Sequence, residues 1–462
     1  MERTTAKKNK YEIDMCNGTI MDKLISFSLP LMLSGILQLM FNAVDIIVVG
    51  RFSGSQALAA VGSTSALINV FTNLFIGISL GANVLTARFY AAGREKEVSE
   101  TVHTAITLAL VSGIVMALVG LVFSRGALAL MGTPDDVIGL SALYMRIYFL
   151  GMPFFMLYNY GAAILRAVGD TKRPLLFLVI AGVINACLNM VLVIVFKLGV
   201  AGVAIATVIS QMISCVLVLR CLCQSKTSYR LRFSELGMKG YYLKQIFSVG
   251  VPAGIQSTVI NFSNVLLQSS VNSFGSTAMA GYTAANNLLG FLYVSVNSIT
   301  QACMSFTSQN YGVGKLKRMD RVLADCMILS VVVAVVLGCI CYGFGPEILQ
   351  IYTEDAEVIA CGMEILAYTT ITYFLCGWMD LFPGALRGMG YSAVPMVLSV
   401  IGTVGTRVVW IFGIFPYHRS LAILFISYPA SWIITIILQV VCFYFVRRRV
   451  HRRSQTLAGQ EG

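Results

Sequence analysis

The sequence contains little charge. Asp, Glu, Lys and Arg make up 12% of its 462 residues, whereas 57% of the residues are hydrophobic. A soluble chain of this length would normally form two or three domains whose surfaces carry far more charge. This composition excludes an ordinary soluble protein and indicates a protein whose surroundings are mainly lipid.

The sequence also lacks the common catalytic motifs. It has three histidines and no HExxH or GxSxG pattern, so an intramembrane hydrolase has little support. No GxxxxGK[ST] loop is present, and YGVGK near Gly312 follows no predicted strand, which argues against ATP hydrolysis. No CxxC motif or His-rich tract accompanies the twelve cysteines, which we interpret as small apolar residues. We therefore expect no enzyme activity and no permanently bound cofactor.

Long apolar stretches are abundant. A hydrocarbon layer about 30 Å thick needs roughly 20 apolar residues for each spanning helix. Residues 1–23 are polar and basic rather than a cleaved signal, so the first stretch stays in the protein. The sequence predicts an all-α membrane protein with twelve transmembrane helices, which begin near Leu24, Ala57, Val102, Ile138, Pro174, Val200, Leu243, Ala278, Leu323, Val358, Val394 and Leu421.

The chain repeats itself once. The stretch LRAVGDTKRP at 165–174 returns as LRGMGYSAVP at 386–395, with Leu, Arg, Gly and Pro at identical spacing. Each copy holds six predicted helices, and an even number returns the chain to its starting side. Two homologous six-helix bundles, 24–223 and 243–446, should therefore share one orientation and be related by a parallel pseudo-two-fold axis. We expect a cytoplasmic N-terminal segment (1–23), a cytoplasmic linker (224–242) and a basic cytoplasmic tail (447–462) that is disordered.

Proline follows the repeat. Pro30 and Pro252 lie inside the first predicted helix of each copy, at almost the same offset as the two LR motifs. Proline removes a helix hydrogen bond, so both helices should bend there. The bend is either a static kink or a hinge between two states.

Basic residues are unevenly distributed. Of the 33 Lys and Arg residues, 27 fall on one predicted side and four on the other, while Arg146 and Arg407 fall inside predicted helices. The positive-inside rule then places both termini in the cytoplasm. The net charge of +12 is a topology signal rather than a nucleic-acid-binding surface.

The first helix carries a polar stripe of Ser34, Gln38, Asn42 and Asp45. A charge at membrane depth costs about 3 kcal/mol, so Asp45 is a functional candidate by default. The structural alternatives are an ion pair or a helix-end cap. Arg51 follows six residues later, so Asp45 could also lie near the surface as a solvated carboxylate.

Asn185 and Asn189 lie four residues apart on the fifth predicted helix, and Thr207 lies on the sixth. Helix rise places all of them in the same half of the membrane as Asp45. Carboxylate, amide and hydroxyl oxygens suit a hard cation or a proton, so Asp45, Asn185 and Asn189 could hold a monovalent cation. The two asparagines could instead join helices by hydrogen bonds alone.

The second copy does not repeat this cluster. The counterparts of Asp45, Asn185, Asn189 and Thr207 are Leu267, Thr406, Trp410 and Tyr428. Other polar residues appear there, and we expect a substrate cavity lined by Gln38, Asn42, Gln256, Asn264, Asp380 and Arg407. Asp380 could alternatively be a structural partner of Arg407 or Arg387.

Four segments resemble the multidrug and toxic compound extrusion (MATE) family of secondary transporters: SLPLMLSGILQLMFNAVDIIVVGRF, LRAVGDTKRPL, GVAGVAIATVISQ and LRGMGYSAVPM. The resemblance implies a V-shaped pair of bundles that exports organic compounds in exchange for sodium or protons. It also implies cation-site roles for Asp45, Asn185, Asn189 and Thr207. Some members have an aspartate where this chain has Asn189, and others carry a glutamate on the seventh helix that is missing here.

These observations lead to a functional hypothesis. We expect a monomeric, multi-pass protein of the bacterial inner membrane that exports organic, cationic or amphipathic compounds by alternating access, with Na⁺ or H⁺ as the coupling ion. Its partners would be small organic substrates and the lipid bilayer. The alternatives are a lipid-linked saccharide flippase, which usually needs a strongly basic cavity, and a membrane sensor that does not transport.

Overall fold

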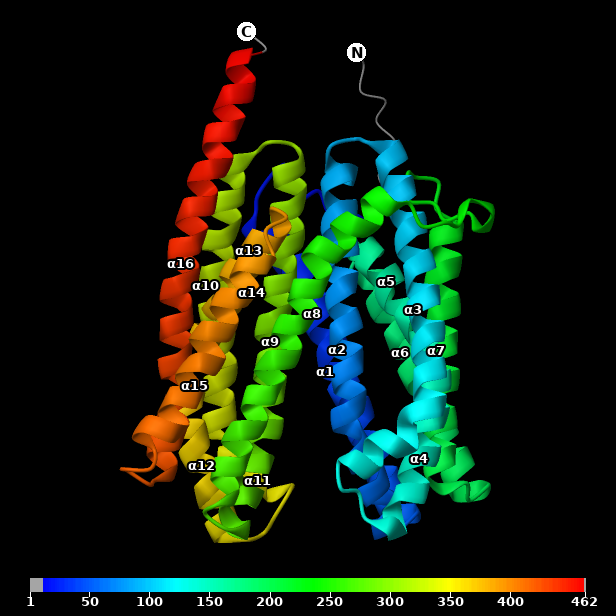
Figure 1. Cartoon of the computed structure of the whole chain (residues 1–462), viewed down its shortest axis with the longest axis vertical. Helices are drawn as coiled ribbons and strands as arrows, with labels where there is room; N and C mark the ends of the chain where they lie inside the picture. Colours follow the sequence, from blue (N-terminus) through cyan, green and yellow to red (C-terminus); the bar gives the residue numbers. More distant parts are fainter. Residues whose placement is uncertain (1–10, 461–462) are drawn as a thin grey trace. The chain divides into compact units, whose positions relative to one another are not determined.

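The computed structural model describes residues 11–460, and these residues form helices joined by short connections, without strands (Figure 1). By its internal packing the chain divides into two compact units. Of the described residues, the first unit holds 11–14 and Leu33–Gly254, and the second holds Met15–Met32 and 255–460.

The first unit is built from the elements between α1 and the start of α8. They are α1 (Met21–Phe52), α2 (Ser55–Ala91), α3 (Glu95–Leu130), α4 (Asp135–Leu150), α5 (Met152–Ala167), α6 (Lys172–Asn189), the π-helix η1 (Met190–Val195), α7 (Gly199–Cys223) and the 3₁₀ turn η2 (Phe233–Glu235). The first part of α8 (Gly240–Asn272) also belongs to this unit, because Gly250 and Gly254 allow its backbone to lie directly against α2.

The second unit contains the remaining elements. They are the rest of α8, α9 (Ser276–Gly312), α10 (Leu316–Gly343), α11 (Gly345–Gln350), α12 (Ala356–Thr369), α13 (Tyr373–Gly388), α14 (Ala393–Ser399), the π-helix η3 (Val400–Gly405), α15 (Thr406–Val409), the π-helix η4 (Trp410–Ile414) and α16 (Leu421–Gln460). Residues 21–32 of α1 belong here too, and Phe27 packs edge-on against Phe306 of α9 at 5.6 Å.

The helices α1 and α8 each belong partly to one unit and partly to the other, and in both helices the boundary lies close to a proline. In α1 the boundary follows Met32 and in α8 it follows Gly254, just beyond Pro30 and Pro252. The helices remain continuous there. The kink and the hinge both stay predictions for these prolines, as do the boundaries 24–223 and 243–446 for the two copies of the repeat.

The predicted number of twelve spans is not exactly confirmed. Eight helices of the described chain are long and apolar enough to cross a membrane, and ten spans result if each of two bent pairs counts once. The bent pairs are α4 with α5, at 47°, and α12 with α13, at 51°. The two remaining long helices, α8 and α9, are rich in Ser, Thr, Asn and Gln, and this lowers their hydropathy.

The bends have local causes that hydropathy alone does not reveal. Pro153 stands at the start of α5, where it cannot continue the preceding helix. Between α12 and α13, the hydroxyls of Thr369, Thr370 and Thr372 each donate to a carbonyl one turn back, a pattern that bends helices. The starts of α5 and α13 are related by the same offset as the LR motifs, so the bend belongs to the repeat.

The repeated LR, G and P spacing is explained by a turn. Gly169 and Gly390 adopt left-handed backbone angles, with φ of 97° and 91°, which glycine adopts without strain. Leu165 and Leu386 are fully buried just before the turn. The prolines that end each motif, Pro174 and Pro395, lie in the first turn of the next helix, where a missing N–H costs nothing.

The linker 224–242 is folded rather than loose. Tyr229 is fully buried, and its hydroxyl and that of Tyr90 each donate to a carboxylate oxygen of Glu12 at 2.7 Å. Burial raises the pKa of Tyr229, so its phenol keeps the proton that it donates.

The tail was expected to be disordered, and this expectation is wrong for its described part. α16 continues to Gln460, and Arg447 forms a two-pronged ion pair with Asp320 of α10 at 2.8–3.0 Å. The ion pair holds the start of the tail against α10. The Arg, Gln, Leu and Ala residues of the tail have a high helix propensity. Residues 1–10 and 461–462, which belong to the predicted terminal segments, lie outside the described residues.

Candidate cation and substrate sites

The first unit brings together the four residues predicted to handle a cation. The amide nitrogen of Asn189 donates to Asp45 Oδ1 and, at 3.2 Å, to Asn185 Oδ1. Thr207 Oγ1 lies 3.5 Å from Asp45 Oδ2, but its single hydrogen has a better acceptor in the Val203 carbonyl at 3.0 Å. The main contact of Asp45 is therefore the amide of Asn189.

Asp45 is buried, and it has no ion-pair partner in the part of the chain that the structure describes. It is 9% exposed, which removes the alternative of a surface carboxylate. Among the described residues, no Lys, Arg or His forms an ion pair with it. A buried carboxylate without a cationic partner is costly, and a positive charge that enters this site would stabilise it.

Asn189 has an unsatisfied group beside Asp45. It is fully buried, and its amide oxygen accepts no hydrogen bond from any residue that the structure describes. Such an orphaned acceptor typically costs about 1–3 kcal/mol. Asn189 is the last residue of α6, directly before η1, and π-turns within helices are frequent at functional sites. With Asp45, Asn185 and Thr207, this oxygen completes an all-oxygen set that fits a hard cation.

Two tyrosines near Asp45 were not anticipated. Tyr144 and Tyr148 stack on each other along α4 at 6.2 Å, and Asp45 acts electrostatically on both. Their spacing of four residues was a signal that they share a helix face. The sequence did not say that this face lies near Asp45.

Gly182 allows α1 to approach α6 next to this site. A Cβ atom at Gly182 would overlap the Phe41 ring, four residues before Asp45. We expect Gly182→Val to push the two helices apart and to destabilise the protein by about 1–3 kcal/mol, as overpacking usually does. Thermal unfolding in detergent measures this loss.

Gly126→Val is the matched control for Gly182→Val, since nothing lies within 4 Å of a Cβ at Gly126. It should lower the melting temperature far less. Adding Phe41→Ala to Gly182→Val should restore part of the loss. Equal melting temperatures for the two valine variants would show that the contact with Phe41 does not limit the approach.

The polar residues of the predicted substrate cavity are divided between the two units. Gln38 and Asn42 are exposed on α1, in the first unit. In the second unit, Gln256 accepts a hydrogen bond from Arg387 at 2.6 Å. Asn264 accepts one from Arg407 at 2.7 Å.

Asp380 forms no ion pair with either arginine considered as its partner. Among the described ion pairs neither Arg387 nor Arg407 reaches it within 4 Å, although Arg387 acts on it electrostatically. The sequence had not indicated Ser263, which accepts from Arg407 at 2.8 Å, because a lone serine in an apolar helix carries no distinctive pattern.

A family model described as MatE matches the chain twice, over residues 30–191 and residues 252–412. The chain belongs to the MatE family. The two matches are separated by the same offset as the LR motifs, to within one position, which agrees with the repeat found in the sequence.

Individual MatE proteins agree with this assignment. The chain is 31% identical over 434 residues to "Probable multidrug resistance protein YoeA" of Bacillus subtilis (strain 168), covering 92% of this chain and 93% of that protein. It is 22% identical over 382 residues to "Multidrug export protein MepA" of Staphylococcus aureus (strain NCTC 8325 / PS 47), covering 82% and 84%. A solved outward-facing structure of a multidrug resistance MATE family transporter superposes with a TM-score of 0.87 at 19% identity, covering 97% of this chain and all of that one.

The comparisons establish the class of protein. The chain is an all-α membrane protein with the two-repeat fold of MATE transporters, and this confirms the predicted fold class apart from the exact number of spans. MATE proteins move small molecules and are not enzymes in general.

Proposed function

We propose that this MatE protein exports organic, cationic or amphipathic compounds in exchange for Na⁺ or H⁺. The observation that carries the proposal is Asp45, a buried carboxylate that has no cationic partner among the described residues and contacts an amide whose own oxygen is unsatisfied. The names of the relatives, which describe multidrug resistance and multidrug export, support the substrate class.

The geometry suggests how ion binding is sensed. The NH₂ group of Asn189 now lies against the oxygens of Asp45 and Asn185, where a cation would otherwise be attracted. A bound cation would repel these N–H groups and favour rotation of the amide, which turns its free oxygen towards the ion. A proton on Asp45 would likewise weaken the contact by removing the negative charge. Either ion changes the link between α1 and α6.

The same helix could convert this change into movement. Asp45 lies in the part of α1 that belongs to the first unit, whereas Pro30 lies in the part that belongs to the second. A change in bend near Pro30 would therefore alternate the access of the substrate. We further propose a monomer in the bacterial inner membrane. Its termini would both be cytoplasmic, because 27 of the 33 basic residues fall on one predicted side.

The test uses purified protein in vesicles loaded with the cationic dye rhodamine 123. Sodium and proton gradients are imposed separately, and the rate of dye movement is measured for each. We expect one gradient to drive export well above the rate in protein-free vesicles. Absence of movement under every gradient would reject export and favour a sensor.

A further inference from the structure

Arg407 is a buried charge inside a membrane-spanning segment. It lies in α15, between the π-helices η3 and η4, within the span Ala393–Ile414, and it is 3% exposed. A charge buried in a membrane-spanning segment is costly and marks a functional site by default.

All of its observed partners are neutral. Arg407 Nη1 donates to Ser263 Oγ at 2.8 Å and to Asn264 Oδ1 at 2.7 Å, and the guanidinium lies 4.7 Å from the centre of the Tyr428 ring. Its Nε is buried and donates to nothing among the described residues.

No carboxylate of the described chain compensates the charge. None of the ion pairs of the described residues includes Arg407, and the ionisable side chains that act on it most strongly are Tyr428, Cys376, Tyr282 and Tyr373. Asp380 is influenced by Arg387 instead. Arg173 and Arg447, by contrast, are each paired with an aspartate. The charge of Arg407 therefore has no counter-ion in the part of the chain that the structure describes.

By the repeat, Arg407 lies in the region of the second unit that corresponds to the candidate cation site of the first unit. Tyr428 is the counterpart of Thr207, and Arg407 directly follows Thr406, the counterpart of Asn185. Asn264 lies three residues before Leu267, the counterpart of Asp45. The same region of the repeated scaffold thus carries a negative charge in one unit and a positive charge in the other, although the two charges come from different helices of the repeat.

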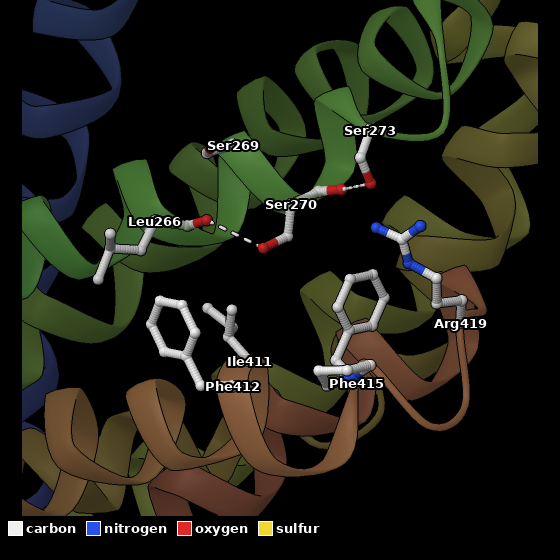
Figure 2. A pocket seen from close by; sticks show the side chains of 9 residues that line it. Leu266, Ser269, Ser270, Ser273, Ile411, Phe412, Phe415 and Arg419 are labelled. Carbon is white, nitrogen blue, oxygen red and sulfur yellow. Dashed lines mark hydrogen bonds between the residues drawn. The ribbon is translucent and has the colours of Figure 1, made fainter.

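A pocket lies about one helical turn beyond the contacts of Arg407, between α8 and the segment that starts with η4. It has a volume of about 440 Å³, within the usual range for small-molecule sites. Figure 2 shows Leu266 and Ser270 of α8 on one side, Ile411, Phe412 and Phe415 on the other, and Arg419 at one end. Ile411 follows Arg407 by four residues, so the pocket could hold the apolar body of a ligand whose charged group reaches inward.

We propose that Arg407 binds the carboxylate of an organic compound whose aromatic or apolar part occupies this pocket. The inference rests on the proposed export function. It specifies zwitterions, which carry a carboxylate beside their cationic group, as one class of substrate. The Nε group that has no acceptor among the described residues can donate to a carboxylate. A carboxylate forms stronger hydrogen bonds with a guanidinium than the neutral groups around Arg407 do.

The experiment compares two dyes that differ in one group. Rhodamine 110 carries a free carboxylate, and rhodamine 123 is its methyl ester. Equilibrium binding to detergent-purified protein is followed by fluorescence anisotropy. Arg407→Gln should weaken binding of the acid about tenfold or more, since it removes a charged hydrogen bond, and should change binding of the ester less than about twofold. Arg407→Lys should retain part of the preference.

Arg146→Gln is the matched control, because Arg146 is an exposed arginine within a helix of the first unit. It should leave both affinities unchanged. On the wild-type protein, benzoate should displace the acid while the neutral benzamide should not, a result that needs no variant.

Three results would overturn the proposal: equal losses for acid and ester in Arg407→Gln, unchanged acid binding in that variant, or no displacement by benzoate. Equal losses would mean that Arg407 only holds α15 against α8. The binding test is separate from export. Asp45→Asn should keep the preference for the acid even if it no longer transports, so failure of one proposal is distinguishable from failure of the other.

Discussion

Asp45→Asn is expected to lower ion-driven export of rhodamine 123 by at least about tenfold, because an uncharged amide neither attracts a cation nor exchanges a proton. The substitution is nearly isosteric, so the contact region of Asn189 keeps its shape. Amount and folding of the protein in the membrane should stay normal, since the change removes a buried charge whose burial is costly. Initial rates of dye export in vesicles, normalised to protein, provide the measurement.

Asp136→Asn is the control for this experiment. It makes the same chemical change at an exposed position in the first turn of α4. Export should remain at the wild-type rate. If Asp45→Asn also exports at that rate under the gradient that drives the wild type, Asp45 is not the coupling group and its burial needs another explanation.

Asn189→Ala is expected to reduce export by about tenfold or more. The change leaves Asp45 in place but removes its amide partner and the orphaned oxygen that we assign to ion binding. It should also raise the ion concentration needed for half-maximal export. The measurement is the export rate over a series of Na⁺ concentrations and, separately, of pH values.

Two further variants make the test of Asn189 specific. Asn189→Asp restores an oxygen ligand and should recover part of the export, whereas alanine cannot. Asn159→Ala removes an amide that donates to the Phe155 carbonyl of its own helix, and should transport normally. Wild-type transport by Asn189→Ala would show that the asparagines of α6 only join helices.

Much of the fold could be predicted from local sequence properties. Hydropathy, which predicted the membrane helices, and the distribution of basic residues, which predicted their orientation, depend only on short stretches of sequence. The two-bundle organisation was predicted from the internal repeat, which needs only a comparison of the chain with itself. The bends between α4 and α5 and between α12 and α13 were missed, because neither interrupts an apolar stretch. The helical start of the tail was missed because its ion pair joins Arg447 to Asp320, which is far away in sequence.

For the candidate site, too, some features could be predicted from the sequence and others could not. The sequence by itself determined which polar residues lie in apolar segments and that the cluster of Asp45, Asn185, Asn189 and Thr207 occurs in one copy only. Only the tertiary structure decided that Asp45 is buried against Asn189 without a cationic partner among the described residues, and that Arg407 has a neutral shell. The reason is physical: burial and partner choice depend on how closely helices approach, and contacts such as Phe41 against Gly182 join residues that no local pattern relates.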